Sequence, residues 1–258
     1  MTKDRNAAEN KNARLAKRAL LLLLVAVFLY SAFQLLNSLM EYNENRRAYE
    51  DVREEYIQVE IPKTPEPGIP HAGGEAPDQT YTGPLWDMNV SIDFEGLKSV
   101  NKQVVGWIMI PDSPINYPIM QAADNQKYLT RALNGKYNKL GSIFLDYRNK
   151  NNFNDPNTII YGHYTKNGSM FGSLHSYKKE EYLDTHRYVY IITEEGTRIY
   201  KIFSARVADV FDDVYDFDLQ KNSKEKDIIT LSTCTTSGRE NERFVVQAKR
   251  IYEDAASL

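Results

Sequence analysis

The stretch Asp227-Ile-Ile-Thr-Leu-Ser-Thr-Cys-Thr-Thr236 is a run of β-branched and apolar residues that ends in small hydroxyl side chains. Ser237 and Gly238 follow it, so the pattern predicts a strand that ends at a polar turn. Cys234 lies at this strand end and is the only cysteine among 258 residues, which leaves no partner for an intramolecular disulfide. An unpaired cysteine is commonly a small buried hydrophobic residue. The alternative here is a reactive thiol, because a strand end is more accessible than a strand centre.

Further β-rich runs, separated by turn signals such as Pro-Asp, Asn-Gly and Glu-Gly, surround this strand in the sequence. These further runs are residues 104–110, 115–121, 142–147, 158–164, 188–193, 198–207 and 244–252, and residues 228–234 are the eighth. Eight short strands with turns between them predict a mainly β fold, either a barrel or a sandwich. Helices are expected at residues 93–101, 125–133 and 169–177, and within residues 212–226.

Residues 19–36, near the N-terminus, form an uncharged stretch of 18 residues that is long and apolar enough to cross a bilayer as a helix. Residues 1–18 carry six basic and two acidic side chains, an excess that predicts a cytoplasmic tail. A cleaved signal peptide is the alternative, but the apolar run is long for one and no small-residue cleavage site follows Leu36. The sequence therefore predicts a single-pass membrane protein anchored by this helix, with the rest of the chain outside the cell.

Three segments follow the anchor. Residues 37–59 are charged, contain no Pro or Gly and predict a helical stalk. Residues 60–84 are rich in Pro and Gly, which indicates an extended spacer. Residues 85–258 are then a single extracellular domain of ordinary size.

Beyond residue 18 the acidic side chains outnumber the basic ones, which argues against a nucleic-acid partner. The sequence contains no Cys/His cluster with metal-ligand spacing.

A reactive cysteine needs a base or a cation beside it, because the thiolate is the nucleophile. Four histidines are candidates. His71 lies in the spacer, and His175 and His186 flank a predicted helix, where a polar surface role is the default. His163 ends an apolar strand and follows Gly162, which permits close approach of another chain. The alternative for His163 is a hydrogen-bonded core residue.

An acyl transfer also needs a group that stabilises the developing oxyanion, and a fixed cation can do this. Arg243 begins the strand that follows the loop containing Gly238, so a hairpin would bring its guanidinium back beside Cys234. Arg239, at the loop tip, is the competing choice. An arginine at a strand start is otherwise a common surface residue.

These three residues lie in segments that resemble the sortase family. Thr230-Leu-Ser-Thr-Cys234 is similar to the sortase signature, and Asn157-Thr-Ile-Ile-Tyr-Gly-His163, together with Arg243, is similar to the other parts of its active site. The resemblance extends over about residues 101–252. The block Gly141-Ser-Ile-Phe-Leu-Asp146, the Ser-Met-Phe segment at 169–171 and the long insertion between residues 206 and 228 are most similar to class B sortases.

The resemblance implies a closed eight-stranded sortase-type β-barrel with N-terminal and inserted helices behind a single transmembrane helix. It implies transpeptidation without a metal or an organic cofactor. Cys234 would attack the carbonyl of a Thr in the C-terminal sorting signal of a secreted protein and form a thioester. An amine of a peptidoglycan crossbridge, or of its lipid-linked precursor, would then accept the acyl group. His163 would act as general acid and then as base, and Arg243 would hold the substrate and the oxyanion.

The resemblance also implies four substrate-binding residues, which are Asn125, Leu129, Tyr161 and Ser232. Thr235 follows the cysteine where some class B members have an acidic residue, so the preferred signal stays open between an Asn-Pro-x-Thr type and a Pro-x-Thr-Gly type. Two other functions remain as alternatives. One is a cysteine hydrolase that uses the same three residues with water as acceptor. The other is a non-catalytic, membrane-tethered binding module, which would leave the combination of these residues unexplained.

Overall fold

A computed structural model describes residues 2–60, 89–217, 227–235 and 239–255. The chain divides into two compact units, Met1–Ala48 and Tyr49–Leu258. The first unit belongs to helix α1 (Thr2–Tyr56). Within it, Lys17–Met40 is long and apolar enough to cross a membrane, and none of this segment is buried. The predicted anchor at residues 19–36 lies inside this segment.

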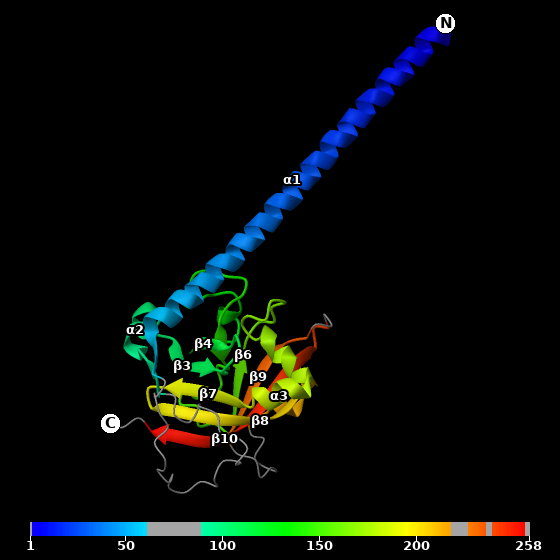
Figure 1. Cartoon of the computed structure of the whole chain (residues 1–258). Helices are drawn as coiled ribbons and strands as arrows, with labels where there is room; N and C mark the ends of the chain where they lie inside the picture. Colours follow the sequence, from blue (N-terminus) through cyan, green and yellow to red (C-terminus); the bar gives the residue numbers. More distant parts are fainter. Residues whose placement is uncertain (1, 61–88, 218–226, 236–238, 256–258) are drawn as a thin grey trace. The chain divides into compact units, whose positions relative to one another are not determined.

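The second unit is built on a closed eight-stranded β-barrel with the strand order β10-β8-β7-β3-β4-β5-β6-β9 (Figure 1). All eight predicted strands are confirmed, with bounds that shift by a few residues. The strands are β3 (Val104–Met109), β4 (Asn116–Met120), β5 (Ile143–Leu145), β6 (Asn157–Tyr161), β7 (Tyr188–Thr193), β8 (Gly196–Asp209), β9 (Ile228–Cys234) and β10 (Glu242–Ala255). The strand pattern in the sequence is compatible with either a barrel or a sandwich, and the structure shows the closed barrel that the family resemblance implies.

Two pairs of adjacent strands, β4–β5 and β6–β9, are parallel, and the other adjacent strands in the barrel are antiparallel. The parallel pair β6–β9 matches Tyr161 with Ser232, so both strands end at the same edge of the barrel. The two strands are apolar runs buried on both faces, as expected for parallel strands. Within β9 the burial is interrupted only at the last residue, Cys234, which is exposed. The register between β6 and β9 therefore determines which residues at the end of β6 lie next to the Cys234 thiol.

Short helices cover the barrel and agree in part with the prediction. Helix α2 (Phe94–Val100) was expected at residues 93–101, and its N-terminus is capped by the Asp93 carboxylate, which accepts a hydrogen bond from the Gly96 amide. The helix expected at residues 125–133 is only the 3₁₀ turn η1 (Lys127–Leu129). The helix expected at 169–177 is η2 (Gly172–Lys178), and α3 (Glu180–Thr185) follows it. Within residues 212–226 the structure contains η3 (Asp213–Tyr215), and residues 218–226 lie outside the described part of the chain.

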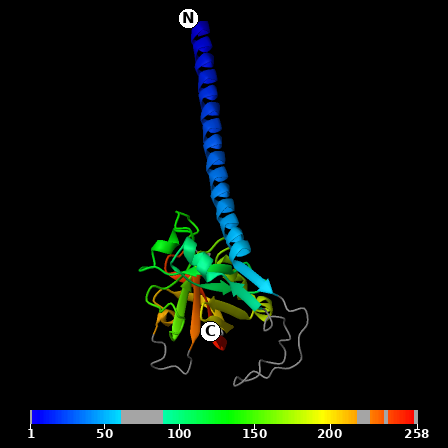
Figure 2. The same ribbon diagram turned by 90° about the vertical axis from the view of Figure 1, so that its left-hand side faces the viewer.

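The expected helical stalk at residues 37–59 is helical as far as Tyr56, but its last turns belong to the barrel unit. Tyr49 is only 5% exposed, and its hydroxyl donates to the carbonyl of Gly141 at 3.1 Å. After α1 the chain forms β1 (Ile57–Glu60), the pale-blue arrow in Figure 2, which pairs with β2 (Asn89–Ile92). The compact unit thus begins at Tyr49, earlier than the expected boundary at residue 85. Of the predicted spacer at 60–84, residues 61–84 lie outside the described residues.

Candidate active site

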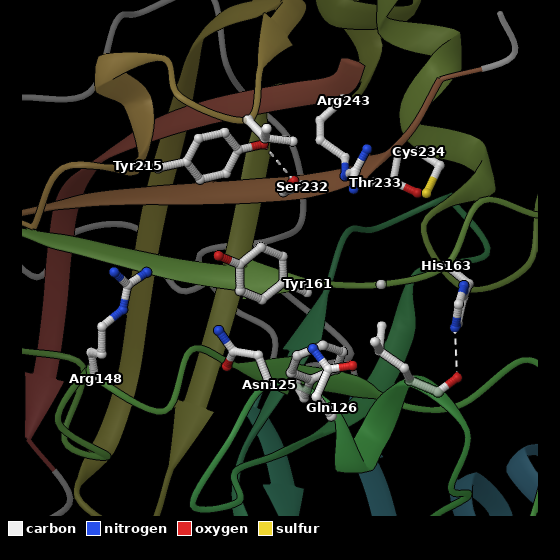
Figure 3. Close-up of a pocket in the computed structure, with 14 residues that line it drawn as sticks. Asn125, Gln126, Arg148, Tyr161, His163, Tyr215, Ser232, Thr233, Cys234 and Arg243 are labelled. Carbon is white, nitrogen blue, oxygen red and sulfur yellow. Dashed lines mark hydrogen bonds between the residues drawn. The ribbon is translucent and has the colours of Figure 1, made fainter. Parts of the chain in front are cut away.

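A pocket of about 390 Å³ lies at the barrel edge where β6 and β9 end (Figure 3). All seven candidate site residues line it, and they are Cys234, His163, Arg243, Asn125, Leu129, Tyr161 and Ser232. They come from four separate parts of the chain, so the fold brings together what the sequence keeps apart.

The parallel register of β6 and β9 places His163 level with Cys234. Tyr161 is the partner of Ser232, and the amide of Gly162 donates to the Ser232 carbonyl at 3.1 Å. His163 and Cys234 each follow two residues after this matched pair. Gly162 is required here, since a Cβ at this position would lie 2.5 Å from Cδ1 of Ile143. The close approach predicted from this glycine is therefore present.

Arg243 is the direct partner of Cys234 on the antiparallel ladder between β9 and β10. Its Nη1 donates to the carbonyls of Glu240 at 2.7 Å and Glu242 at 3.0 Å, which fix the guanidinium. In the described residues no carboxylate forms an ion pair with Arg243, so its charge is available to a ligand. The competing Arg239 is instead paired with the Glu242 carboxylate at 2.7 Å and is 74% exposed.

His163 is half-buried at the pocket wall, and Nε2 of its ring lies 2.7 Å from the Leu129 carbonyl oxygen. Because a carbonyl only accepts, Nε2 carries the proton in this hydrogen bond. The other ring nitrogen, Nδ1, is left for chemistry. In Figure 3 the Cys234 sulfur lies between the Arg243 guanidinium and the His163 ring. This arrangement offers a nucleophile, a proton carrier and a cation around one point.

The far wall of the pocket is organised by Asp146, whose carboxylate is completely buried. It accepts hydrogen bonds from Asn125 Nδ2 at 2.9 Å, from the Tyr161 hydroxyl at 3.0 Å and from both Nε and Nη2 of Arg148 at 2.9 Å. Burial opposes ionisation of this carboxyl, but the hydrogen bonds from Arg148, Asn125 and Tyr161 outweigh it, and the pKa of Asp146 is lowered. Burial and the neighbouring Asp146 raise the pKa of Tyr161, whose hydroxyl stays protonated.

No sequence pattern indicated a role for Asp146 or Arg148, although Asp146 ends one of the quoted sortase-like blocks. Nor did any pattern single out Tyr215, in η3, whose hydroxyl lies 2.8 Å from Oγ of Ser232. Tyr215 comes from the long insertion before β9, where no local pattern marks a contact with that strand. Arg148 and Tyr215 line the pocket, and Asp146 holds three lining residues in place, which are Asn125, Tyr161 and Arg148.

The remaining histidines differ from one another. His71 lies outside the described residues. His186 stacks on Tyr182, and its Nε2 donates to the Asp112 carbonyl at 3.0 Å, away from the pocket. His175 was expected to have a surface role, yet its Nε2 donates to the carbonyl of Cys234 at 2.9 Å. Among the described residues, no group of three or more His, Cys, Asp or Glu side chains could hold a metal ion.

Comparisons with known proteins agree on one family. The Sortase domain family model matches residues 108–251, which is more than half of the chain. Sortase B of Listeria monocytogenes is 32% identical over 257 residues, which cover 91% of this chain and 96% of the relative. Sortase B of Staphylococcus aureus is 26% identical over 253 residues, which cover 89% of this chain and 94% of the relative.

Solved structures agree with this result. The Staphylococcus aureus sortase B–substrate complex is 30% identical, with a TM-score of 0.56 and coverage of 64% of this chain and 85% of that one. Sortase B of B. anthracis in complex with AAEK1 is 33% identical, with a TM-score of 0.59 and coverage of 83% of this chain and 99% of that one. The chain therefore belongs to the sortase family, as an enzyme of the class B type.

Proposed function

We propose that the protein is a membrane-anchored transpeptidase that cleaves the C-terminal sorting signal of secreted proteins after a Thr. It would transfer the acyl group to a cell-wall peptide amine. The observation that carries this proposal is the position of Cys234 at the pocket, on the same rung as Arg243 and level with His163. The resemblance to class B sortases gives the reaction type, and the geometry supports a role for each side chain.

In the first half of the reaction the Cys234 sulfur attacks the Thr carbonyl carbon. The C–N bond then breaks, His163 gives a proton to the leaving amine, and a thioester remains on Cys234. In the second half an acceptor amine attacks the thioester carbonyl. His163 takes up the amine proton as the C–S bond breaks, which returns the thiolate and the protonated ring. The acyl group keeps its activation throughout, so no cofactor has to supply energy.

Arg243 would stabilise the oxyanion that forms in both halves. Two backbone carbonyls hold its Nη1, so its remaining donors are presented to the pocket in a fixed geometry. A pre-oriented donor of this kind stabilises a developing charge without reorganising at the moment of reaction. The absence of a paired carboxylate among the described residues supports the same role.

The far wall would bind the residues of the sorting signal that precede the Thr. Because Tyr161 donates its only proton to Asp146, its hydroxyl oxygen is left as an acceptor towards the pocket. Asn125 gives one amide hydrogen to Asp146 and accepts from the Tyr147 amide at 3.0 Å, which fixes its orientation. Leu129 and Ser232 complete this part of the lining. Both the Asn-Pro-x-Thr and the Pro-x-Thr-Gly types of signal are candidates for this wall.

The membrane placement belongs to the same proposal. Residues 1–18 would be a cytoplasmic tail, residues 19–36 the anchor and residues 37–48 a helical stalk. The extracellular catalytic unit would begin at Tyr49, and the Pro- and Gly-rich residues 61–84 would be a spacer between β1 and β2. The basic excess before Lys17–Met40 supports this orientation. Such a protein would meet secreted substrates as they leave the membrane, together with a crossbridge or lipid-linked amine at the cell surface.

The test is to incubate the full chain, in detergent, with peptides of both signal types, with and without an amine acceptor. Mass spectrometry then identifies the products. A peptide joined to the amine supports the transpeptidase. Products that contain only added water at high amine concentration would favour the hydrolase, and binding without cleavage would favour the binding module. A Cys234→Ala protein that still cleaves would refute the mechanism.

A further inference from the structure

His175 contacts the end of β9 at a point where backbone pairing has stopped. The Ser232 carbonyl accepts a hydrogen bond from Gly162 on the β6 side of the strand. Carbonyls along a strand alternate in direction, so the carbonyl two residues later, that of Cys234, points to the same side. Strand β6 ends at Tyr161, and no further rung forms there. Nε2 of His175 donates to this carbonyl at 2.9 Å and takes the place of the missing backbone donor.

The His175 ring also packs against two aromatic side chains. Its centroid lies 4.7 Å from that of Tyr164, the residue after His163. It also stacks on Phe244, the residue after Arg243, at 4.7 Å between centroids with 28° between the planes. One side chain therefore contacts all three segments that carry the proposed catalytic residues.

The chemistry of the ring fits a fixed donor. A carbonyl acceptor requires the proton on Nε2, which leaves Nδ1 unprotonated. Nδ1 is buried and makes no hydrogen bond within the described part of the chain. Burial, with a smaller contribution from Lys178, lowers the pKa of His175, although the bond to the Cys234 carbonyl opposes this. The neutral tautomer is thus the one that this environment favours.

We propose that His175 is a positioning residue for the sortase reaction. By donating to the Cys234 carbonyl it fixes the backbone of the nucleophile relative to His163 and Arg243. It does not touch the substrate. The inference rests on the proposed function of Cys234, and it assigns to the site a second histidine, which is not among the residues that line the pocket.

The test compares His175→Gln with His175→Met in the full chain. The two side chains are similar in size and both lose the ring contacts, but only Gln keeps a hydrogen-bond donor. We expect kcat for peptide transfer to be about tenfold lower in the Met variant than in the Gln variant, with KM unchanged, because a misplaced nucleophile affects the chemical step. Equal kcat values in the two folded variants would overturn the proposal.

His186 provides the matched control, since it too stacks on an aromatic ring and donates to a backbone carbonyl, but away from the pocket. His186→Gln and His186→Met are expected to transfer peptide at the same rate. A tenfold difference between them as well would show a general effect on the fold and would overturn the proposal. If His175→Met fails to fold, His175→Phe replaces it, because it keeps a ring against Tyr164 and Phe244 without a donor.

A second readout needs no substrate. Cys234 is the only cysteine, so iodoacetamide reports on it alone. We expect its alkylation rate to differ by about threefold between the Gln and Met variants at position 175. Equal rates would overturn the inference. If the wild-type protein transfers no peptide but the alkylation rates differ, the proposed function fails and the positioning role stands.

Discussion

Cys234 and Arg243 occupy the same rung of the β9–β10 ladder, so the thiol and the guanidinium are held by one pair of backbone partners. Their separation in space does not depend on the loop that joins the two strands. The guanidinium is further fixed by the carbonyls of Glu240 and Glu242. The cation is therefore built into the barrel beside the proposed nucleophile.

The first prediction concerns this pair. Arg243→Ala is expected to lower kcat/KM for peptide cleavage by about a hundredfold or more, because it removes a fixed oxyanion donor. The midpoint of thermal unfolding is expected to change little. Arg239→Ala is the matched control, since Arg239 is exposed and paired with Glu242, and it is expected to keep wild-type kinetics. An Arg243→Ala protein that is as active as the control would contradict the proposed role.

The second prediction concerns Gly162. Gly162→Ala places a Cβ against Ile143 and Phe171 and is expected to destabilise the fold by about 1–3 kcal/mol. It is also expected to reduce kcat, because the residue after it is His163. Denaturant unfolding and peptide kinetics measure the two effects. A variant with wild-type stability and activity would show that the strand end relaxes freely at this position.

The third prediction concerns Asp146. Asp146→Asn removes the charge that orients Arg148, Asn125 and Tyr161 and replaces one of the two acceptor oxygens with an NH2 group, so the unfolding free energy is expected to fall by about 2 kcal/mol. KM for the peptide is expected to rise, whereas alkylation of Cys234 by iodoacetamide stays unchanged. Asp155→Asn is the control for KM, because Asp155 accepts hydrogen bonds from Asn149 Nδ2 at 2.9 Å and the Lys150 amide at 2.6 Å but is not among the pocket-lining residues. A raised KM in both variants would argue against a specific role.

The fourth prediction is the pH dependence of the same carboxyl. Its pKa is lower in the folded protein than the usual value near 4, so the unfolded chain binds a proton more readily. The stabilisation from Asp146 is therefore complete above about pH 5 and is lost as the pH falls through the folded-state pKa. The difference in unfolding free energy between wild type and Asp146→Asn is expected to be constant from pH 7 to pH 5 and to shrink near pH 3. A difference in unfolding free energy that grows on acidification would show that folding raises the pKa of Asp146 and does not lower it.

The fifth prediction tests the end of α1. Tyr49→Phe removes a buried hydroxyl whose single proton lies between two acceptors, the Gly141 carbonyl and Oγ of Ser142, both at 3.1 Å. It is expected to lower the unfolding free energy of the barrel by about 1–2 kcal/mol and to leave kcat unchanged. Tyr30→Phe, within the exposed apolar segment of α1, is expected to have no effect on barrel stability. Equal unfolding free energies of the two variants would show that the Tyr49 hydroxyl does not stabilise the barrel.

The strands were predictable because each is a local pattern of β-branched and aromatic residues with turn residues at its ends. The hairpin position of Arg243 also followed from short spacing along the chain. Local patterns failed where the contact joins distant segments. Nothing near Asp146 in the sequence points to Asn125, 21 residues earlier, and nothing near His175 points to Cys234, 59 residues later. Tyr49 was assigned to a stalk because its partner, Gly141, lies 92 residues away.

The parallel pairing of β6 and β9 also bears on how such enzymes diversify. Two parallel strands cannot be joined by a tight turn, so the chain between Tyr161 and Ile228 must travel around the barrel before it returns. The part of this connection between β8 and β9 contributes Tyr215 to the pocket, whereas the pairing of β6 with β9 sets the spacing of His163 and Cys234. We expect the loop between β8 and β9 to tolerate insertions and deletions that alter which peptides are accepted, while the reacting groups keep their places. Selectivity can thus evolve separately from chemistry in this barrel.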